Sequence, residues 1–276
     1  MSDRVTINVE GGVADVRLNR PDKLNAVDVA MFGALAEAGE SLKSNPSVRA
    51  VVLSGEGRGF CSGLDFSSFQ AMAGPSTDGS GRQGGDGGLT DVGRRDGRIT
   101  NLGQQAAYVW TELPQPVIAA VHGAAVGAGI QIALACDIRI IAPDAKMSVL
   151  EIRWGLIPDM TGTQMLPRLV GLDVAKELAF TGRMVSGEEA VQLGLATRLS
   201  DDPRADALEL AREIASKNPY ATRGVKALLN MAGQVPLADA FKAEERTMMS
   251  LIGSPNNVEA VTAYFEKRDP KFDDVA

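Results

Sequence analysis

The chain has 276 residues, of which 45% are hydrophobic, and a formal net charge of −7. This length suffices for one large domain or two small ones, and the acidic balance argues against a nucleic-acid-binding surface. The two cysteines, Cys61 and Cys136, stand in no metal-binding or redox spacing. That usage is typical of a reducing compartment and predicts a cytoplasmic protein without a bound metal.

Residues 117–136 form an apolar run with the length of a membrane-spanning helix. The run is rich in glycine and alanine, and Asp137 and Arg139 follow it at once. A buried strand, a turn and a helix explain it better. The N-terminus is polar and charged, which predicts no signal peptide. The sequence therefore predicts no association with a membrane.

Strand and helix patterns alternate along the first half of the chain. Apolar runs bounded by turn residues predict strands at residues 5–9, 13–18, 48–53, 117–121 and 138–141. Residues 25–44 are a predicted amphipathic helix, because apolar side chains recur there at helical spacing. Residues 73–97 are rich in glycine and nearly free of large apolar side chains, so we expect a mobile loop.

The pattern changes to helices alone after about residue 200. Helices are predicted at residues 205–216, 220–232, 237–252 and 257–267. The chain therefore divides into a mixed part at residues 1–200 and a helical part at residues 201–276.

Two glycine-rich turns each follow a predicted buried strand, at residues 57–65 and 121–131. Small residues let a ligand approach the backbone, and the start of a helix offers N–H groups without internal partners. Such groups suit an oxygen that becomes negative during a reaction. Two turns of this kind that converge on one oxygen would form an oxyanion hole.

Four segments that include these turns, at residues 18–26, 57–65, 122–137 and 151–164, resemble the crotonase superfamily, which is also called the enoyl-CoA hydratase/isomerase family. A weaker similarity covers residues 263–272, and the motifs follow the family's order over nearly the whole chain. The resemblance implies an α/β fold, the crotonase-like ββα spiral, with a C-terminal helical oligomerisation region. It also implies a homotrimer or homohexamer.

The resemblance implies an enzyme of acyl-CoA metabolism, such as fatty-acid β-oxidation, that works through a thioester enolate. The N–H groups of Leu64 and Ala128 would form its oxyanion hole. The family usually has glycine at the position of Ala128. Alanine keeps the N–H group, so the hole survives unless the backbone needs a positive φ there.

The acid and base groups depart from the family's hydratase pattern. Hydratases of the family use two glutamates, and this chain has Gln131 at one of these positions and Glu151 at the other. Glutamine cannot exchange a proton as a carboxylate does, although it can orient a neighbour or a water molecule by hydrogen bonds. Asp159 follows Glu151 at the spacing found in the family's dienoyl-CoA isomerases, which have aspartate where this chain has Gln131. The pattern favours double-bond isomerisation by Glu151 and Asp159.

Coenzyme A enters as part of the substrate, and no separate cofactor is implied. In the family its adenine lies between the first motif and the first glycine-rich turn. The residues that the resemblance places at the substrate are Lys23, Leu24, Ala26, Ser62, Gly63, Asp65, Gly127 and Lys271. Three further basic residues are candidates for contacts with the phosphates, namely Arg20, Arg58 and Lys267.

Three alternatives remain open at the level of the sequence. The first is an enoyl-CoA hydratase that adds water to a 2-enoyl-CoA. The second is a serine hydrolase, which would pair His122 with Ser62 or Ser148. The third is an acyl-CoA-binding protein without catalytic activity.

Overall fold

The computed structural model describes residues 3–65 and 98–275. The loop expected at residues 73–97 lies outside the described residues and stays a prediction.

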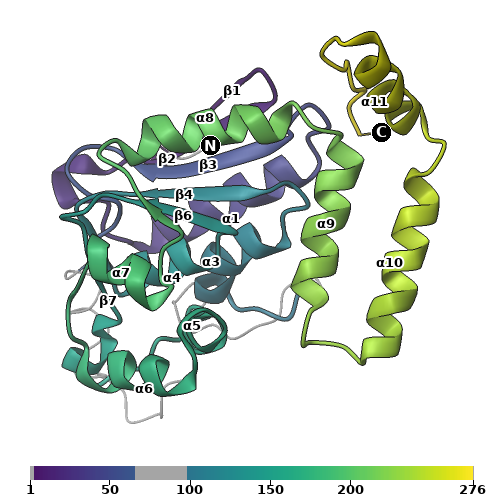
Figure 1. The fold of residues 1–276 in the computed structure, drawn as a ribbon. Helices are drawn as coiled ribbons and strands as arrows, with labels where there is room; N and C mark the ends of the chain where they lie inside the picture. The colour runs from purple at the N-terminus through teal and green to yellow at the C-terminus, as the bar shows by residue number, and fades with distance from the viewer. Residues whose placement is uncertain (1–2, 66–97, 276) are drawn as a thin grey trace.

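A six-stranded sheet forms the centre of the described structure (Figure 1). Five strands run parallel in the order β2-β3-β4-β6-β9, and β1 pairs antiparallel with β2 at one edge. The bounds are β1 (Val5–Glu10), β2 (Val13–Leu18), β3 (Ala50–Gly55), β4 (Val117–Val121), β6 (Ile138–Ile141) and β9 (Arg198–Leu199). The sequence predicted β1, β2, β4 and β6 closely, whereas β3 begins and ends later than predicted.

Both faces of this sheet are covered, because alternate residues of its central strands point to opposite sides. Val51 and Leu53 pack into the larger apolar cluster, and Ala50 and Val52 into a smaller one. The larger cluster lies under the helices α1 (Val29–Lys43), α3 (Leu102–Glu112) and α4 (Ala128–Leu134). The smaller one is closed by α8 (Pro203–Ala215), which crosses the other face (Figure 1).

A second, three-stranded sheet continues from the first. β4 leads into β5 (Ala124–Val126), and β6 leads into β7 (Lys146–Ser148), which pairs with β8 (Val185–Ser186). The first strand of each pair therefore joins the large sheet, and the second joins the small one. A helix follows each pair, which confirms the predicted ββα pattern.

The remaining short elements connect the strands and longer helices. They are the 3-10 helices η1 (Pro21–Lys23) and η2 (Leu150–Trp154) and the helices α5 (Gly162–Val170), α6 (Leu172–Thr181) and α7 (Gly187–Leu193).

The predicted start of the first long helix is wrong by four residues. The helix α1 begins at Val29, because the Asp28 side chain accepts a hydrogen bond from the Met31 N–H group and caps it. The preceding residues Leu24 and Asn25 have left-handed backbone angles, with φ of 49° and 56°. The apolar periodicity of the sequence continues into this segment. Its polar side chain Asn25, however, binds the backbone of the first glycine-rich turn.

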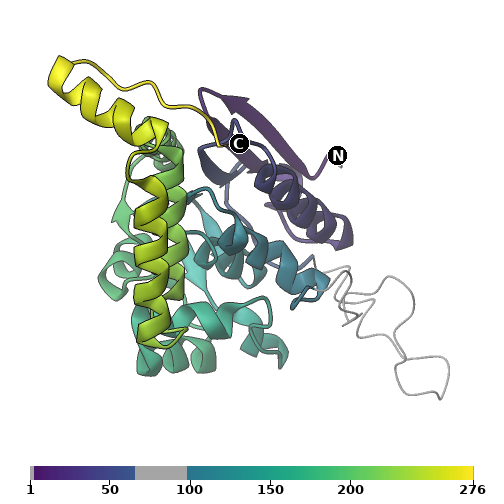
Figure 2. The same ribbon diagram turned by 90° about the vertical axis from the view of Figure 1, so that its right-hand side faces the viewer.

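Three helices follow α8 and stand beside the core (Figures 1 and 2). They are α9 (Pro219–Met231), α10 (Leu237–Leu251) and α11 (Pro255–Glu266). All four C-terminal helices match the predicted ones to within two residues at each end. α10 buries none of its residues, and several large apolar side chains of α9 and α10 are exposed, namely Val225, Leu229, Leu237, Phe241, Met248 and Met249.

Candidate active site

The two glycine-rich turns lie side by side at the C-terminal ends of β3 and β4. Phe60 N donates to His122 O at 2.8 Å, and Cys61 N donates to Ala124 O at 2.8 Å. Val126 N donates back to Cys61 O at 3.1 Å. This short ladder, with a bridge between Cys61 and Ala125, fixes the register of the first turn against β5.

Gly63 and Gly127 lie where the two turns approach each other. Their φ angles are 91° and 56°, a region that favours glycine. A Cβ atom on Gly63 would lie 2.9 Å from Val126 O, and one on Gly127 would lie 3.7 Å from the Gly63 Cα. The same Cβ on Gly127 would lie 3.6 Å from Glu151 Oε1. The turns and Glu151 therefore share one site.

Within residues 3–65 and 98–275, the N–H groups of the predicted oxyanion donors Leu64 and Ala128 have no backbone acceptor. Val27 N donates to Gly63 O at 2.7 Å, and Asp65 N donates to Val27 O at 2.9 Å. This parallel pairing turns the intervening Leu64 N–H group to the opposite side. Ala128 is the first residue of α4, where an N–H group has no partner within the helix.

The backbone of Ala128 does not require glycine. The residue lies in helix α4 and is absent from the positive-φ residues of the described chain. The condition under which alanine keeps a usable N–H group is therefore met.

Asn25 joins the first motif to the first glycine-rich turn. Its side chain is fully buried, and its Oδ1 accepts from Arg20 N at 2.8 Å. Its Nδ2 donates to Glu56 O at 2.9 Å and to Gly59 O at 2.8 Å. Asn25 belongs to the first motif, residues 18–26, but the spacing of that motif predicts no role for the Asn25 side chain.

Arg20 and Asp65 form a second link between the same segments. Arg20 Nη1 lies 2.5 Å from Asp65 Oδ2 and donates to Ala26 O at 3.1 Å. Both side chains are mostly buried. The structure thus shows the two side chains bound to each other. The contacts predicted for Arg20 with phosphate and for Asp65 with the substrate stay predictions.

Gln131 sits at the centre of a fully formed hydrogen-bond network. Its Oε1 accepts from Met160 N at 2.8 Å and from Gly162 N at 2.9 Å. Its Nε2 donates to Glu151 Oε1 at 2.7 Å. Because two N–H groups point at one atom of the amide, that atom is the oxygen. Gln131 thus orients Glu151 and holds the turn that follows Pro158.

One carboxylate oxygen of Glu151, Oε2, is buried and makes no hydrogen bond among the described residues. Burial raises the pKa of this carboxyl above its ordinary value, and the nearby charge of Asp159 raises it further. The hydrogen bonds from Gln131 and from its own backbone oppose this shift.

Asp159 lies near Glu151 but in a more open position. The residue as a whole is exposed, while partial burial of its carboxyl raises the pKa of Asp159 as well. It lines a cavity of about 620 Å³ that also borders α3, α5 and the end of α9. The structure therefore places Glu151 beside the glycine turns and in contact with Gln131, and it brings Asp159 near enough to act on Glu151 by its charge.

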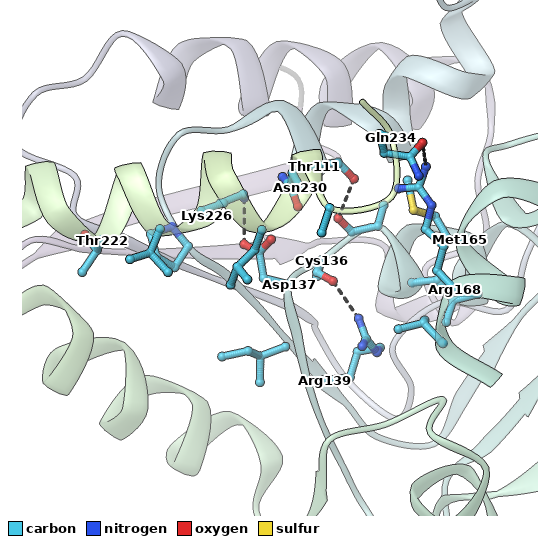
Figure 3. Close-up of a pocket in the computed structure, with 18 of the residues that line it drawn as sticks. Thr111, Cys136, Asp137, Arg139, Met165, Arg168, Thr222, Lys226, Asn230 and Gln234 are labelled. Carbon is cyan, nitrogen blue, oxygen red and sulfur yellow. Dashed lines mark hydrogen bonds and ion pairs between the residues drawn. The ribbon is translucent and has the colours of Figure 1, made fainter. Parts of the chain in front are cut away.

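A larger cavity of about 930 Å³ lies elsewhere, between α9 and the core (Figure 3). Its lining includes Lys226, whose Nζ lies 2.7 Å from Asp137 Oδ2 and donates to Trp110 O and Gln115 O. Neither Glu151 nor the glycine turns line this cavity. Its buried ion pair joins α9 to the core, a contact that the sequence did not predict.

The structure does not pair His122 with either serine proposed for a hydrolase. His122 Nε2 lies 3.0 Å from Gly57 O, and the Ser148 hydroxyl donates to Gly182 O at 2.9 Å. The Ser62 hydroxyl donates to Lys23 O at 3.3 Å. His122 therefore holds the first glycine turn.

Most residues predicted at coenzyme A come together. Ser62 N donates to Leu24 O at 2.9 Å, so residues 23–26 lie beside residues 62–65. Lys23 and Arg58 are exposed nearby. Lys271 lies apart, because the segment that follows it is held by Arg49, at the opposite end of β3. Within one chain, Lys271 does not join this group.

The described residues contain no helix long and apolar enough to cross a membrane. In the same ranges, no three histidine, cysteine or acidic residues cluster as metal ligands would.

Comparisons with known proteins agree with this geometry. The family model described as enoyl-CoA hydratase/isomerase matches residues 8–92 and 91–275. The chain is 34% identical over 268 residues to a peroxisomal Delta(3,5)-Delta(2,4)-dienoyl-CoA isomerase of Arabidopsis thaliana, covering 96% of this chain and 94% of the relative. It is 33% identical to a mitochondrial methylglutaconyl-CoA hydratase of Mus musculus, covering 95% and 79%.

A solved structure of a putative enoyl-CoA hydratase from Streptomyces coelicolor A3(2) superposes with a TM-score of 0.85 at 37% identity, and the match covers 98% of this chain and 94% of the other. Fold, glycine turns and sequence similarity lead to the same conclusion. The chain belongs to the enoyl-CoA hydratase/isomerase family and is a crotonase-type enzyme.

Proposed function

We propose that the protein moves a double bond within an unsaturated acyl-CoA thioester. Glu151 removes a proton from the carbon beside the thioester carbonyl, and the electron pair passes into the enolate oxygen. The N–H groups of Leu64 and Ala128 stabilise that oxygen, each by a few kcal/mol. Asp159 returns a proton at the far end of the conjugated system, and the thioester carbonyl re-forms. No cofactor is needed besides the coenzyme A that the substrate carries.

The choice of isomerisation over hydration rests on Gln131, which replaces a glutamate of the family's hydratases. Its amide donates to Glu151 at 2.7 Å and cannot serve as a second acid or base. Glu151 and Asp159 are then the ionisable groups left at this place. Both pKa values are raised by burial, which brings carboxyl groups closer to the range where they exchange protons at neutral pH. The isomerase from Arabidopsis among the relatives supports the same choice.

The test is the product formed from two substrates. The purified protein is incubated with a 3,5-dienoyl-CoA and, separately, with crotonyl-CoA, and the products are measured by absorbance and mass. We expect a shifted absorbance at unchanged mass for the dienoyl thioester. Glu151→Gln should lower this turnover by about 10²–10⁴-fold, the usual contribution of a positioned acid or base. Full turnover in that variant would contradict the mechanism.

Asp159→Asn separates the two chemistries. An isomerase that uses Asp159 as its acid loses activity in this variant by a similar factor. A hydratase that relies on Glu151 alone loses much less.

Hydration is the second candidate, since the relatives include a methylglutaconyl-CoA hydratase. A gain of one water by crotonyl-CoA would establish it. Gln131→Glu places a second carboxyl beside Glu151, so it should raise hydration of crotonyl-CoA relative to isomerisation. Hydration that is already high in the natural protein and falls in Gln131→Glu would assign the amide itself a role in binding water.

We also propose that the protein assembles as a homotrimer or homohexamer through its C-terminal helices. An exposed apolar surface as extensive as that of α9 and α10 is typical of a contact between chains. The resemblance to the family implies the same arrangement.

A further inference from the structure

Arg20 lies in a setting that is unfavourable for a contact with phosphate. Its side chain is 14% exposed, and its Nη1 atom lies 2.5 Å from Asp65 Oδ2 and 3.6 Å from Asp28 Oδ2. Two carboxylates thus lie within ion-pair distance of one guanidinium, and they offset its attraction for a further anion. The resemblance makes Arg20 a candidate for the phosphates of coenzyme A, but its contacts indicate another role.

The contacts of Arg20 join the two segments that hold the Leu64 N–H group. Its Nη1 donates to Ala26 O at 3.1 Å, and Ala26 directly precedes Val27. The same atom donates at 2.5 Å to the carboxylate of Asp65, which directly follows Leu64. Val27 pairs with the backbone on both sides of Leu64. One arginine nitrogen therefore ties together both sides of the ladder that sets the direction of this N–H group.

The backbone that Arg20 holds has little stiffness of its own. Between β3 and Leu64 the chain contains Gly57, Gly59 and Gly63, two of which have positive φ angles of 81° and 91°. Glycine has more backbone conformations open to it than other residues. A donor to an oxyanion must lie about 2.7–3.1 Å from the oxygen, and a displacement of about 1 Å can cost on the order of 10²-fold in rate. A fixed side-chain contact beside Leu64 therefore has a use in catalysis.

Stability alone explains the pair of Arg20 and Asp65 poorly. The side chain of Asp65 is 8% exposed, so both charges are largely removed from water. This removal costs about as much as the attraction returns, and apolar side chains in place of a buried ion pair are often equally stabilising. An ion pair adds direction, because its hydrogen bonds fix the atoms that it joins.

We infer that Arg20 is a positioning residue that acts through Asp65 on the oxyanion hole. It keeps the Leu64 N–H group aimed at the thioester oxygen and does not itself contact the substrate. The inference rests on the proposed function, because Leu64 is an oxyanion donor only in that mechanism.

Arg20→Met tests this role against a contact with phosphate. The variant keeps an apolar side chain but lacks the guanidinium. We expect kcat for the dienoyl thioester to fall about 10²-fold while KM changes by less than about threefold, since the donor acts in the transition state. A phosphate ligand would contribute to binding, so its loss would raise KM and leave kcat in place. That second pattern would overturn the inference.

The carbonyl stretching frequency of a bound thioester reports on the oxyanion hole without turnover. A saturated acyl-CoA labelled at its carbonyl carbon is measured by isotope-edited infrared spectroscopy. Hydrogen bonds from Leu64 and Ala128 should lower the frequency relative to that of the free thioester. Arg20→Met should lose about half of this shift, because one of two donors is displaced. Arg20→Lys keeps the charge and should retain more of it.

The same measurement separates this inference from the proposed function. A shift that is unchanged in Arg20→Met would overturn the inference and leave the proposed function standing. Glu151→Gln should keep the full shift, so a failure of the proton-transfer step appears only in turnover. If the natural protein shows no shift, the oxyanion hole is wrong, and both proposals fall with it.

A double variant separates positioning from folding. Arg20→Met leaves Asp65 nearly buried without this cation and should lower the melting temperature. Arg20→Met combined with Asp65→Leu should recover the melting temperature. Its kcat and carbonyl shift should stay low, because an apolar contact has no direction. Recovery of all three quantities would show a structural role only and would overturn the inference.

Arg204→Met is the matched control. Arg204 Nη2 lies 2.5 Å from Asp15 Oδ2, whose side chain is also 8% exposed, and this pair joins α8 to β2. The variant should lower the melting temperature and leave kcat and the carbonyl shift unchanged. A similar loss of kcat in Arg204→Met would assign the effect of Arg20→Met to general destabilisation, against the inference.

Discussion

Glu151 has one carboxylate oxygen held by Gln131 and one that is buried without a hydrogen-bond partner among the described residues. In the proposed mechanism, this second oxygen accepts the proton of the substrate. The same arrangement is unfavourable for the folded state once the carboxyl ionises, because burial disfavours the charged form. Catalytic competence and stability therefore oppose each other at this residue.

Glu151→Gln should stabilise the protein at neutral pH. The pKa of Glu151 is raised in the folded state. As the pH rises above the ordinary carboxyl pKa of 4.5, the unfolded chain therefore releases this proton while the folded protein still holds it. The free energy of unfolding thus falls as the pH rises from 4.5 to the pKa of the folded state, and Glu151→Gln should not show this decrease. Melting curves should coincide near pH 4 and diverge by a few degrees at pH 7 to 8, on the order of 2–4 °C for each kcal/mol. Coinciding curves at every pH would contradict it.

Glu259→Gln is the matched control with the opposite sign. An ion pair with Arg268 lowers the pKa of Glu259 to about 2, so its contribution exists above the ordinary carboxyl pKa and is lost as the pH falls towards 2. This variant should be slightly less stable than the natural protein at pH 7. The pair lies at the surface, so the effect should be small and should shrink in salt.

Sequence patterns predicted some site residues and missed others for a physical reason. Glu151 and Gln131 belong to motifs with a fixed spacing, so their proximity could be anticipated. Asn25 acts through hydrogen bonds to backbone groups more than twenty residues away, which no spacing reveals. A polar residue inside an apolar helical pattern was the one signal that could have identified Asn25.

At the scale of elements, the short ladder between residues 60–61 and β5 positions the two glycine turns. The strand β4 could be predicted, because it is a short apolar run buried on both faces. The two-residue strands β8 and β9 lacked any such run. The start of α1 was mispredicted, since the amphipathic pattern continues into residues whose polar groups bind the first glycine turn.

Gly63→Ala should lose both stability and activity. Its φ of 91° disfavours alanine by about 1–2 kcal/mol, and the new Cβ would lie 2.9 Å from Val126 O. The first turn must then shift away from β5 and take the Leu64 N–H group with it. Chemical denaturation and the turnover assay measure the two effects.

Gly11→Ala is the matched control for backbone strain alone. Gly11 has a φ of 57° in the β1–β2 hairpin, and a Cβ there would meet nothing within 4 Å. We expect it to lose about 1–2 kcal/mol of stability while its turnover stays near that of the natural protein. Equal losses of turnover in both variants would mean that strain, and not the contact between the turns, governs the site.

At the scale of the whole molecule, α9 is joined to the core by a buried charge. Lys226→Met leaves Asp137 buried without its cation, which should cost about 3–5 kcal/mol of unfolding free energy. Lys217→Met removes an exposed pair with Glu213 and should cost at most about 0.5 kcal/mol. Denaturant titration measures both. A small loss in Lys226→Met would mean that α9 is held by apolar packing instead.

The exposed apolar face of α10 allows the proposed assembly to be tested directly. Phe241→Asp combined with Met249→Asp should lower the mass of the particle, as measured by light scattering after size exclusion, to that of one chain. Lys242→Gln changes a charged residue of the same helix, exposed in the single chain, and should leave the mass unchanged. A natural protein that already runs as a monomer of 29.0 kDa would exclude the assembly.

The oxyanion donors proposed at Leu64 and Ala128 are main-chain groups, which has a consequence for how this enzyme can change. Every amino acid except proline supplies the same N–H group, so the genetic code offers few single substitutions that delete the donor itself. Side chains at both positions are thus free to be exchanged under selection. New acyl groups can be accommodated there while the machinery that stabilises the enolate is inherited intact.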